Sequence, residues 1–286
     1  MAITSVKDVV DAELNGRVRQ YGWRKTPSQT TTIGVWFDLS MSPGNPAPKY
    51  WFDSSPLIAK AVYQSTDGGL YHGANVSPST KYLRSVTAYT AVATALPLNM
   101  FLCDYLLYYP SIDDGTTDVQ NMTNIVTLPR YTTGKGVQMI AVTVAGRTGG
   151  QQFYVTYTNS DGVAGRISQT VTQNASSSVG VITTSNRAVQ ASGNPFIGLQ
   201  AGDSGVRSID SVTMLGTDVG LFTLILVKPL AQINIRGIDA PVEKDFLLMD
   251  NALPVIVDDA YLSYLTLPQG TLSSTALIGD IKVIWN

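Results

Sequence analysis

The sequence predicts a mainly β protein: an antiparallel, jelly-roll-like β-sandwich with a short N-terminal helix and arm. Charged residues make up only 14% of the chain, against roughly 25% in an ordinary globular domain. Thr, Ser, Gly, Asn, Val and Tyr, which are typical of strands and turns, take their place. Many short apolar runs separated by turns also favour a sandwich over alternating strands and helices. At 286 residues the chain is long enough for one large β domain or two smaller ones.

The first predicted element is a short helix. Ser5 is a suitable N-cap, and Asp8 three residues later makes a variant of the capping box. Asn15-Gly16 is a plausible stop. The apolar face of this helix consists of Val6, Val9, Val10 and Leu14.

The residues that follow the helix carry no clear period up to about residue 34. They are either a docking arm or the lead-in to the first strand. We predict a helix and docking arm over residues 1–25 and a β-sandwich body over residues 26–286.

A second helix is predicted over residues 55–65. Ser55 would cap it, and Pro56 would occupy the first helical position. Asp67-Gly68-Gly69 would end it. Its inward face would consist of Leu57, Ile58, Ala61 and Val62.

Strand signals dominate from about residue 82. The segment 137–144 is apolar at nearly every position, which indicates a strand covered on both faces. Residues 153–158 alternate, a turn follows at 159–162, and 167–171 continues the pattern, which predicts a hairpin. Further strands are predicted at 179–184, 206–214, 221–227, 255–257, 261–267 and 281–285.

A weak internal echo suggests two related β halves, about 26–145 and 146–286. Ala-Leu-Pro at 95–97 precedes Asp104, and the same three letters at 252–254 precede Asp259. The alternative, which we favour, is that residue combinations common in strands and turns recur by chance.

Composition argues against several functional classes. The net charge is −2 with no basic block, so nothing suggests nucleic-acid binding. No apolar run approaches the ~20 residues that span a bilayer. The first residues lack a signal-peptide pattern, and Cys103 is the lone cysteine, so we expect synthesis in a reducing cytosol. One Cys and one His, His72, are too few for a zinc or iron–sulfur site, and we expect no cofactor.

The sharpest motif is the Gly-Asp-Ser-Gly segment at 202–205. It resembles the nucleophile loop of chymotrypsin-like serine proteases, and His72, Asp104 and Ser204 follow in the order of that family. The family usually has another Gly where this chain has Val206, and the surroundings of His72 differ. A β-turn is the favoured interpretation. We therefore assign no catalytic residue.

Two carboxylate groups have alternative interpretations. Asp113, Asp114 and Asp118 supply the oxygen ligands that suit Ca²⁺, but the spacing is not that of an EF-hand. A solvated turn is favoured over a metal site at 113–118. Asp104 lies within an apolar run, so we expect it to pair with Arg84, Arg130 or Arg207 in a structural role.

Two aromatic clusters, at 50–52 and at 108–109, do not alternate cleanly. They are candidates for a protein interface, because interface centres are poor in charge and rich in aromatic residues.

Several segments of the sequence resemble segments of structural proteins of tailed-bacteriophage virions. They lie at 96–98 (Leu-Pro-Leu), 104–110 (Asp-Tyr-Leu-Leu-Tyr-Tyr-Pro), 126–138, 157–166 and 199–207. The resemblance runs over most of the chain after residue 50 and contains no catalytic motif. It implies a β-rich protein that is made in the host cytoplasm and assembles in many copies in the virion.

The resemblance implies a non-enzymatic role, with capsid decoration or cementing as the first expectation. The partners would be the major capsid protein or other virion proteins, and further copies of the chain in a homo-oligomer. One alternative is another virion part, such as a head fibre, collar, tail or baseplate, including one that binds host glycans. Another is an enzyme, either a serine protease using Ser204 or a glycan hydrolase using paired aspartates.

Overall fold

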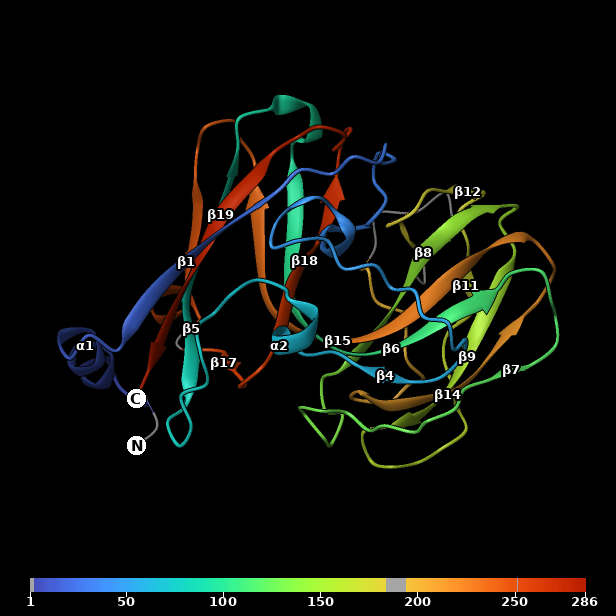
Figure 1. The fold of residues 1–286 in the computed structure, drawn as a ribbon, viewed down its shortest axis with the longest axis horizontal. Coiled ribbons are helices and arrows are strands. Elements are labelled where there is room, and N and C mark those ends of the chain that lie inside the picture. Colours follow the sequence, from blue (N-terminus) through green and yellow to red (C-terminus); the bar gives the residue numbers. More distant parts are fainter. Residues whose placement is uncertain (1–2, 184–193, 251) are drawn as a thin grey trace.

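The described part of the chain forms three antiparallel sheets (Figure 1). The computed structural model describes residues 3–183, 194–250 and 252–286. The N-terminal sheet has the order β16-β5-β19-β1-β3, with β17 beside β5. Its strands are β1 (Val18–Lys25), β3 (Gly44–Asn45), β5 (Lys81–Thr90), β16 (Val242–Asp245), β17 (Val255–Ile256) and β19 (Leu277–Trp285).

The other two sheets lie to the right of this sheet in Figure 1. The central sheet has the order β12-β8-β15-β6-β18-β2, with β13 beside β8 and β4 beside β6. Its strands are β2 (Phe37–Asp38), β4 (Lys60–Ala61), β6 (Leu98–Asp113), β8 (Gln138–Thr148), β12 (Ser176–Ser177), β13 (Ile182–Thr183), β15 (Val219–Ile235) and β18 (Tyr261–Pro268). The small sheet, with the order β10-β9-β14-β7 and β11 beside β9, consists of β7 (Gln120–Asn121), β9 (Gln152–Asn159), β10 (Arg166–Ile167), β11 (Val171–Thr172) and β14 (Val206–Met214).

The long strands β6 and β15 pass through both halves of the molecule. At one end of β6, Met100 and Leu102 pack in a core with the N-terminal sheet. Toward the other end, Leu106, Leu107 and Tyr109 pack in a second core with the small sheet. A register shift in the β6–β15 pairing between these segments turns two consecutive leucines to the same side. The protein is therefore two β-sandwiches that share one sheet.

A third core covers the opposite face of the central sheet. Trp36 and Trp51, from the irregular segment before β5, pack there against Tyr105 and neighbouring aliphatic residues. The rings of Trp51 and Tyr105 are stacked with centroids 5.4 Å apart. Covering both faces explains why β8 and β18 are apolar at nearly every position.

The predicted mainly β, antiparallel sandwich is confirmed, with three sheets where a jelly roll has two. The hairpin predicted after residue 153 is confirmed as β9 with β10 and β11. Strand β13 falls in the predicted strand 179–184, whose last residue lies outside the described residues. Because β6 pairs with β15, the expected halves 26–145 and 146–286 meet in one sheet. Whether the two halves arose by duplication or share these letters by chance, the interpretation favoured from the sequence, is not decided by this pairing.

The N-terminal helix is α1 (Val6–Leu14), and its predicted capping box is confirmed: the Ser5 hydroxyl accepts the N–H of Asp8, and the Asp8 carboxylate accepts the N–H of Ser5. The inward face of α1 places Val9 and Ala12 on the N-terminal sheet. Residues 18–25 of the expected arm form β1, which pairs with β19 over eight residues. Residues 1–2 of that arm lie outside the described residues.

The helix predicted over residues 55–65 is wrong. Lys60 and Ala61 form β4 beside β6, and Leu57 has a positive φ of 62°. The N–H of Leu57 donates to Pro110, and that of Ala59 to Thr123. Strand β6 and the segment after β7 thus satisfy this backbone in place of a helix. The remaining short helices are α2 (Gln64–Asp67), α3 (Phe246–Met249) and the 3₁₀ turns Leu39–Met41 and Ala93–Ala95.

Candidate functional site

His72, the first member of the candidate catalytic triad, is fully buried and has both ring nitrogens occupied. Nε2 lies 2.9 Å from the carbonyl oxygen of Ala260, which can only accept, so this nitrogen carries the proton. Nδ1 therefore accepts from the Lys81 ammonium at 3.1 Å. Burial, and secondly the charge of Lys81, lowers the pKa of His72 to about 4. This imidazole has no free lone pair for a serine hydroxyl.

Asp104 is fully buried and pairs with Arg130, one of its three predicted partners. Arg130 donates from Nε at 2.9 Å and from Nη2 at 2.8 Å. The carboxylate also accepts the backbone N–H of Tyr261 at 3.1 Å. Burial raises the pKa of Asp104 to about 6 while the guanidinium opposes that shift. The expected structural ion pair is confirmed.

Ser204 lies in a loop held to the small sheet by polar contacts. Its hydroxyl is 2.8 Å from that of Ser160. The neighbouring Asp203 accepts hydrogen bonds from Tyr157, Asn159 and Arg166 at 2.5 to 3.0 Å. The bond from Arg166 is the main reason that the pKa of Asp203 falls to about 2. These hydrogen bonds fix the Gly-Asp-Ser-Gly loop against the small sheet.

The second glycine of that motif has a packing role. A Cβ on Gly205 would lie 2.0 Å from the carbonyl oxygen of Gly134 and 2.7 Å from the amide nitrogen of Gly136. Only glycine permits this close approach of two backbones. The structure does not bring Ser204 into hydrogen-bonding contact with His72 or Asp104.

The aspartates at 113–118 separate instead of converging. Asp113 accepts the N–H of Gly115 within its own turn. Asp114 is buried and binds Arg147 at 2.5 and 3.0 Å, with Gln173 as a further donor. Asp118 is exposed. Within residues 3–183, 194–250 and 252–286, no group of three or more His, Cys, Asp or Glu side chains is placed to hold a metal ion.

Asp38 is a buried carboxylate that sequence reasoning missed. It accepts two hydrogen bonds from Ser40, one from Trp51 and one from the Tyr105 hydroxyl, at 2.6 to 2.9 Å. Burial raises the pKa of this carboxyl. The acceptor role of Asp38 explains why two polar aromatic groups are tolerated in the third core. A signal was present in the Asp-Leu-Ser spacing, which is typical of a carboxylate that caps its own turn.

The two aromatic clusters divide between core and surface. Tyr108 and Tyr109 are buried, as is Trp51. Tyr50 and Phe52 are about half exposed, at 50% and 48%. Of the two clusters that were predicted to form a protein interface, only Tyr50 and Phe52 have side chains exposed enough to do so.

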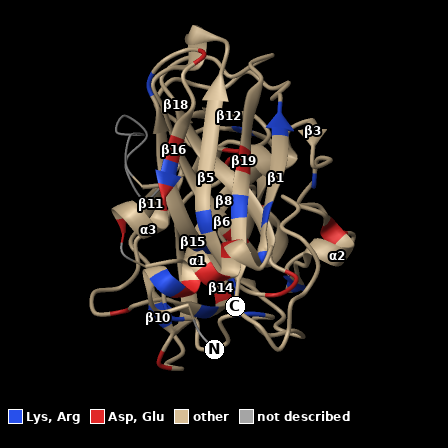
Figure 2. Ribbon diagram, turned by 90° about the vertical axis from the view of Figure 1, so that its left-hand side faces the viewer, with Lys and Arg blue, Asp and Glu red and all other residues tan. Residues whose placement is uncertain are grey.

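An uncovered apolar surface lies on α1 and α3. We call it the N-terminal patch; its members are Val6, Val10, Leu14, Leu248 and Met249. Figure 2 shows both helices on the face that carries β16, β5, β19 and β1. A groove of about 570 Å³ runs between them, lined in part by Ile3, Val6, Leu247 and Leu253. Leu14 is 81% exposed and Leu248 is 77% exposed, which is unusual for leucine.

Charged groups beside the N-terminal patch are already paired. Lys7 binds Asp11 one turn along the helix. Glu13 binds Lys282, and Arg84 binds Asp245. These charges are therefore neutralised by their partners. A protein that binds the patch would gain binding free energy mainly by burying apolar surface.

No helix in the described part of the chain combines the length and apolarity that a membrane crossing requires. Neither a protein-family model nor a curated protein matches the sequence. A solved structure of infectious bursal disease virus, Gx strain, aligns with 94% of this chain and 80% of its own, at 10% identity and a TM-score of 0.16. A likeness at that level carries no argument.

Proposed function

We propose that the protein is a non-enzymatic structural component of a virion that decorates or cements the capsid shell. The observation that carries the proposal is the N-terminal patch, which exposes Leu14 and Leu248 beside paired charges. Exposed apolar side chains that gather on two neighbouring helices are typical of interaction sites. The sequence segments that resemble tailed-bacteriophage virion proteins suggest the class of partner.

The mechanism assigns different tasks to the two faces of α1. The inward residues Val9 and Ala12 fix the helix on the N-terminal sheet. The outward residues Val6, Val10 and Leu14 would pack against the major capsid protein. Burial of about 800 Å² per partner makes a stable contact. The same contact would recur by symmetry over the shell, including contacts between copies of this chain.

A non-enzymatic role is also supported by the bonds of the candidate catalytic residues. His72 and Asp104 are each held in the core by hydrogen bonds to structural partners, and neither contacts Ser204. A fluorophosphonate probe tests the protease alternative directly. We expect no labelling of Ser204; labelling that disappears in Ser204→Ala would contradict the proposal.

The docking test uses shells assembled without this chain. We expect the purified protein to bind them, and the double variant Val10→Ser with Leu14→Ser to bind at least about tenfold less, because it removes exposed apolar area. A matched control is Ile125→Ser with Val163→Ser, two exposed apolar residues elsewhere. Equal binding of both double variants would contradict the N-terminal patch as the docking surface.

The location on the particle distinguishes the remaining alternatives. Binding to tails or baseplates and not to shells would move the role to adsorption or joining. Binding to neither would contradict a virion role, provided that the protein keeps its unfolding midpoint.

A further inference from the structure

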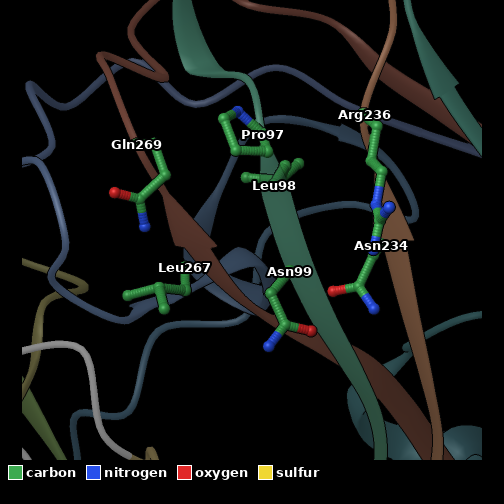
Figure 3. A pocket seen from close by; sticks show the side chains of 7 residues that line it. All are labelled: Pro97, Leu98, Asn99, Asn234, Arg236, Leu267 and Gln269. Carbon is green, nitrogen blue, oxygen red and sulfur yellow. The ribbon is translucent and has the colours of Figure 1, made fainter.

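A second surface feature lies at the far end of the central sheet. There β6, β15 and β18 enclose an open groove of about 510 Å³. Figure 3 shows its lining: Asn99 and Pro97 on and before β6, Asn234 and Arg236 on and after β15, and Leu267 and Gln269 on and after β18. The groove belongs to no candidate site discussed above.

Strand register fixes the arrangement of the polar groups. Asn99 of β6 is directly opposite Asn234 of β15 and directly opposite Leu267 of β18. Directly opposed residues project from the same face of a sheet and lie about 5 Å apart. The three side chains therefore form a row across rigid strands. Arg236 and Gln269 follow two residues further along the chain, just after the ends of β15 and β18, on either side of Pro97 (Figure 3).

The polar groups of the groove are largely unused. Asn99 Oδ1 accepts from Gln232 at 3.0 Å, which leaves the Asn99 amide N–H groups free. Within the described residues, the side chains of Asn234, Arg236 and Gln269 make no hydrogen bond or ion pair, whereas the backbone N–H of Gln269 donates to Ala95. Among the described residues that line the groove there is no carboxylate, and Arg236 is the only charged one.

We propose that this groove binds an acidic oligosaccharide. Side-chain amides carry both donors and acceptors, which match sugar hydroxyls. The guanidinium of Arg236 offers a planar fork that pairs with a carboxylate through two hydrogen bonds. Pro97 and Leu267 supply apolar surface for the C–H faces of the sugar rings. The proposal goes beyond the structural role proposed above and does not depend on it.

A second groove with an exposed tyrosine, Tyr71, is a weaker candidate. It is lined in part by Asn75 and Asp259. Asp259 already accepts two hydrogen bonds from Ser65, and Asn75 accepts from the backbone of Asp259. Its polar groups hold the loop together, whereas those beside Arg236 are free to bind a ligand.

The test is a titration of the full chain with trigalacturonate, followed by calorimetry and by the side-chain amide NMR signals of Asn99, Asn234 and Gln269. Maltotriose serves as the neutral trisaccharide. We expect trigalacturonate to bind and to shift these amide signals. Arg236→Gln should weaken it by about tenfold or more, since a charge-assisted two-point contact is lost. Arg236→Lys should recover only part of the loss.

The charge-matched control is Arg24→Gln, which changes an exposed arginine on β1 of the N-terminal sheet. It should leave binding unchanged. The proposal is overturned if trigalacturonate does not bind, if maltotriose binds equally well, or if Arg24→Gln weakens binding as much as Arg236→Gln. It is also overturned if the amide signals respond to protein concentration alone, which would assign the groove to contact between copies of this chain. None of these results bears on docking through α1.

Discussion

Arg130 and Asp104 form a two-point ion pair in the interior, with donor–acceptor distances of 2.8 and 2.9 Å. Arg130 also donates to the backbone oxygens of Val62 and Tyr105, while Asp104 accepts from the backbone of Tyr261. The pair thus ties the segment after β4 to two strands of the central sheet. It lies near the register shift where β6 passes from one sandwich to the other.

Breaking this pair should be costly. We expect Asp104→Asn to lower the free energy of unfolding by about 3–5 kcal/mol, because it leaves the Arg130 charge buried without its counter-ion. Urea unfolding at pH 7 measures the change. The control is Asp11→Asn, which removes an exposed pair with Lys7 and should have no measurable effect. Equal effects of the two substitutions would contradict a special role for the buried pair.

Stability should fall in mild acid because of His72. Its pKa is lowered to about 4 in the folded state, from 6.5. Between these values the unfolded chain binds a proton that the folded chain does not, so the free energy of unfolding rises with pH. The stability lost between pH 6.5 and pH 4 should amount to roughly 3 kcal/mol from this group.

Substitution by glutamine isolates this effect. His72→Gln keeps one donor for Ala260 and one acceptor for Lys81, but it cannot titrate. Urea unfolding across pH 4 to 7 should show a pH dependence in the natural protein that exceeds that of the variant. Because Asp104 titrates in the same window, the difference between the two proteins is the quantity to compare. Parallel curves would rule out His72 as the cause.

The Gly-Asp-Ser-Gly loop gives a test of packing. Gly205→Ala should lower the free energy of unfolding by about 1–3 kcal/mol, because the new Cβ meets the backbone of Gly134 and Gly136. Gly146→Ala is a control, since its Cβ would meet no atom closer than 4.0 Å. Thermal unfolding of both variants measures the contrast. Two unchanged midpoints would mean that the loop can move away at little cost.

Truncation separates the docking helix from the body. Removal of residues 1–25 should destroy the fold of the N-terminal sheet, because it deletes β1 beside β19. Removal of residues 1–15 deletes α1 alone, and we expect a folded protein with weakened binding to shells. Circular dichroism and a shell-binding assay report the two properties. A folded protein after the longer truncation would contradict the contribution of β1.

Local signals in the sequence predicted local structure well. The capping box of α1 and the turn after β9 are complete within a few residues, so both were predictable. The segment 55–65 has good helical spacing, yet pairing of Lys60 with Tyr108 of β6 prevails over it. Strand β1 escaped notice because its exposed face carries polar residues in no regular period.

Candidate sites depended on contacts between distant segments. The need of Asp104 for a cation was evident from the apolar residues around it, and Arg130 was among the choices. Asp38 accepts a hydrogen bond from Tyr105, which is 67 residues away in the sequence. Composition and local spacing do not reveal such a contact. The groove around Arg236 depends on the register of three strands, which the sequence leaves open.

Immunogold electron microscopy of intact virions, with an antibody to this chain, tests the central claim most directly. We expect label spread over the head, at a density that reflects repeated docking through the N-terminal patch. Label on no part of the particle would contradict a structural role in the virion.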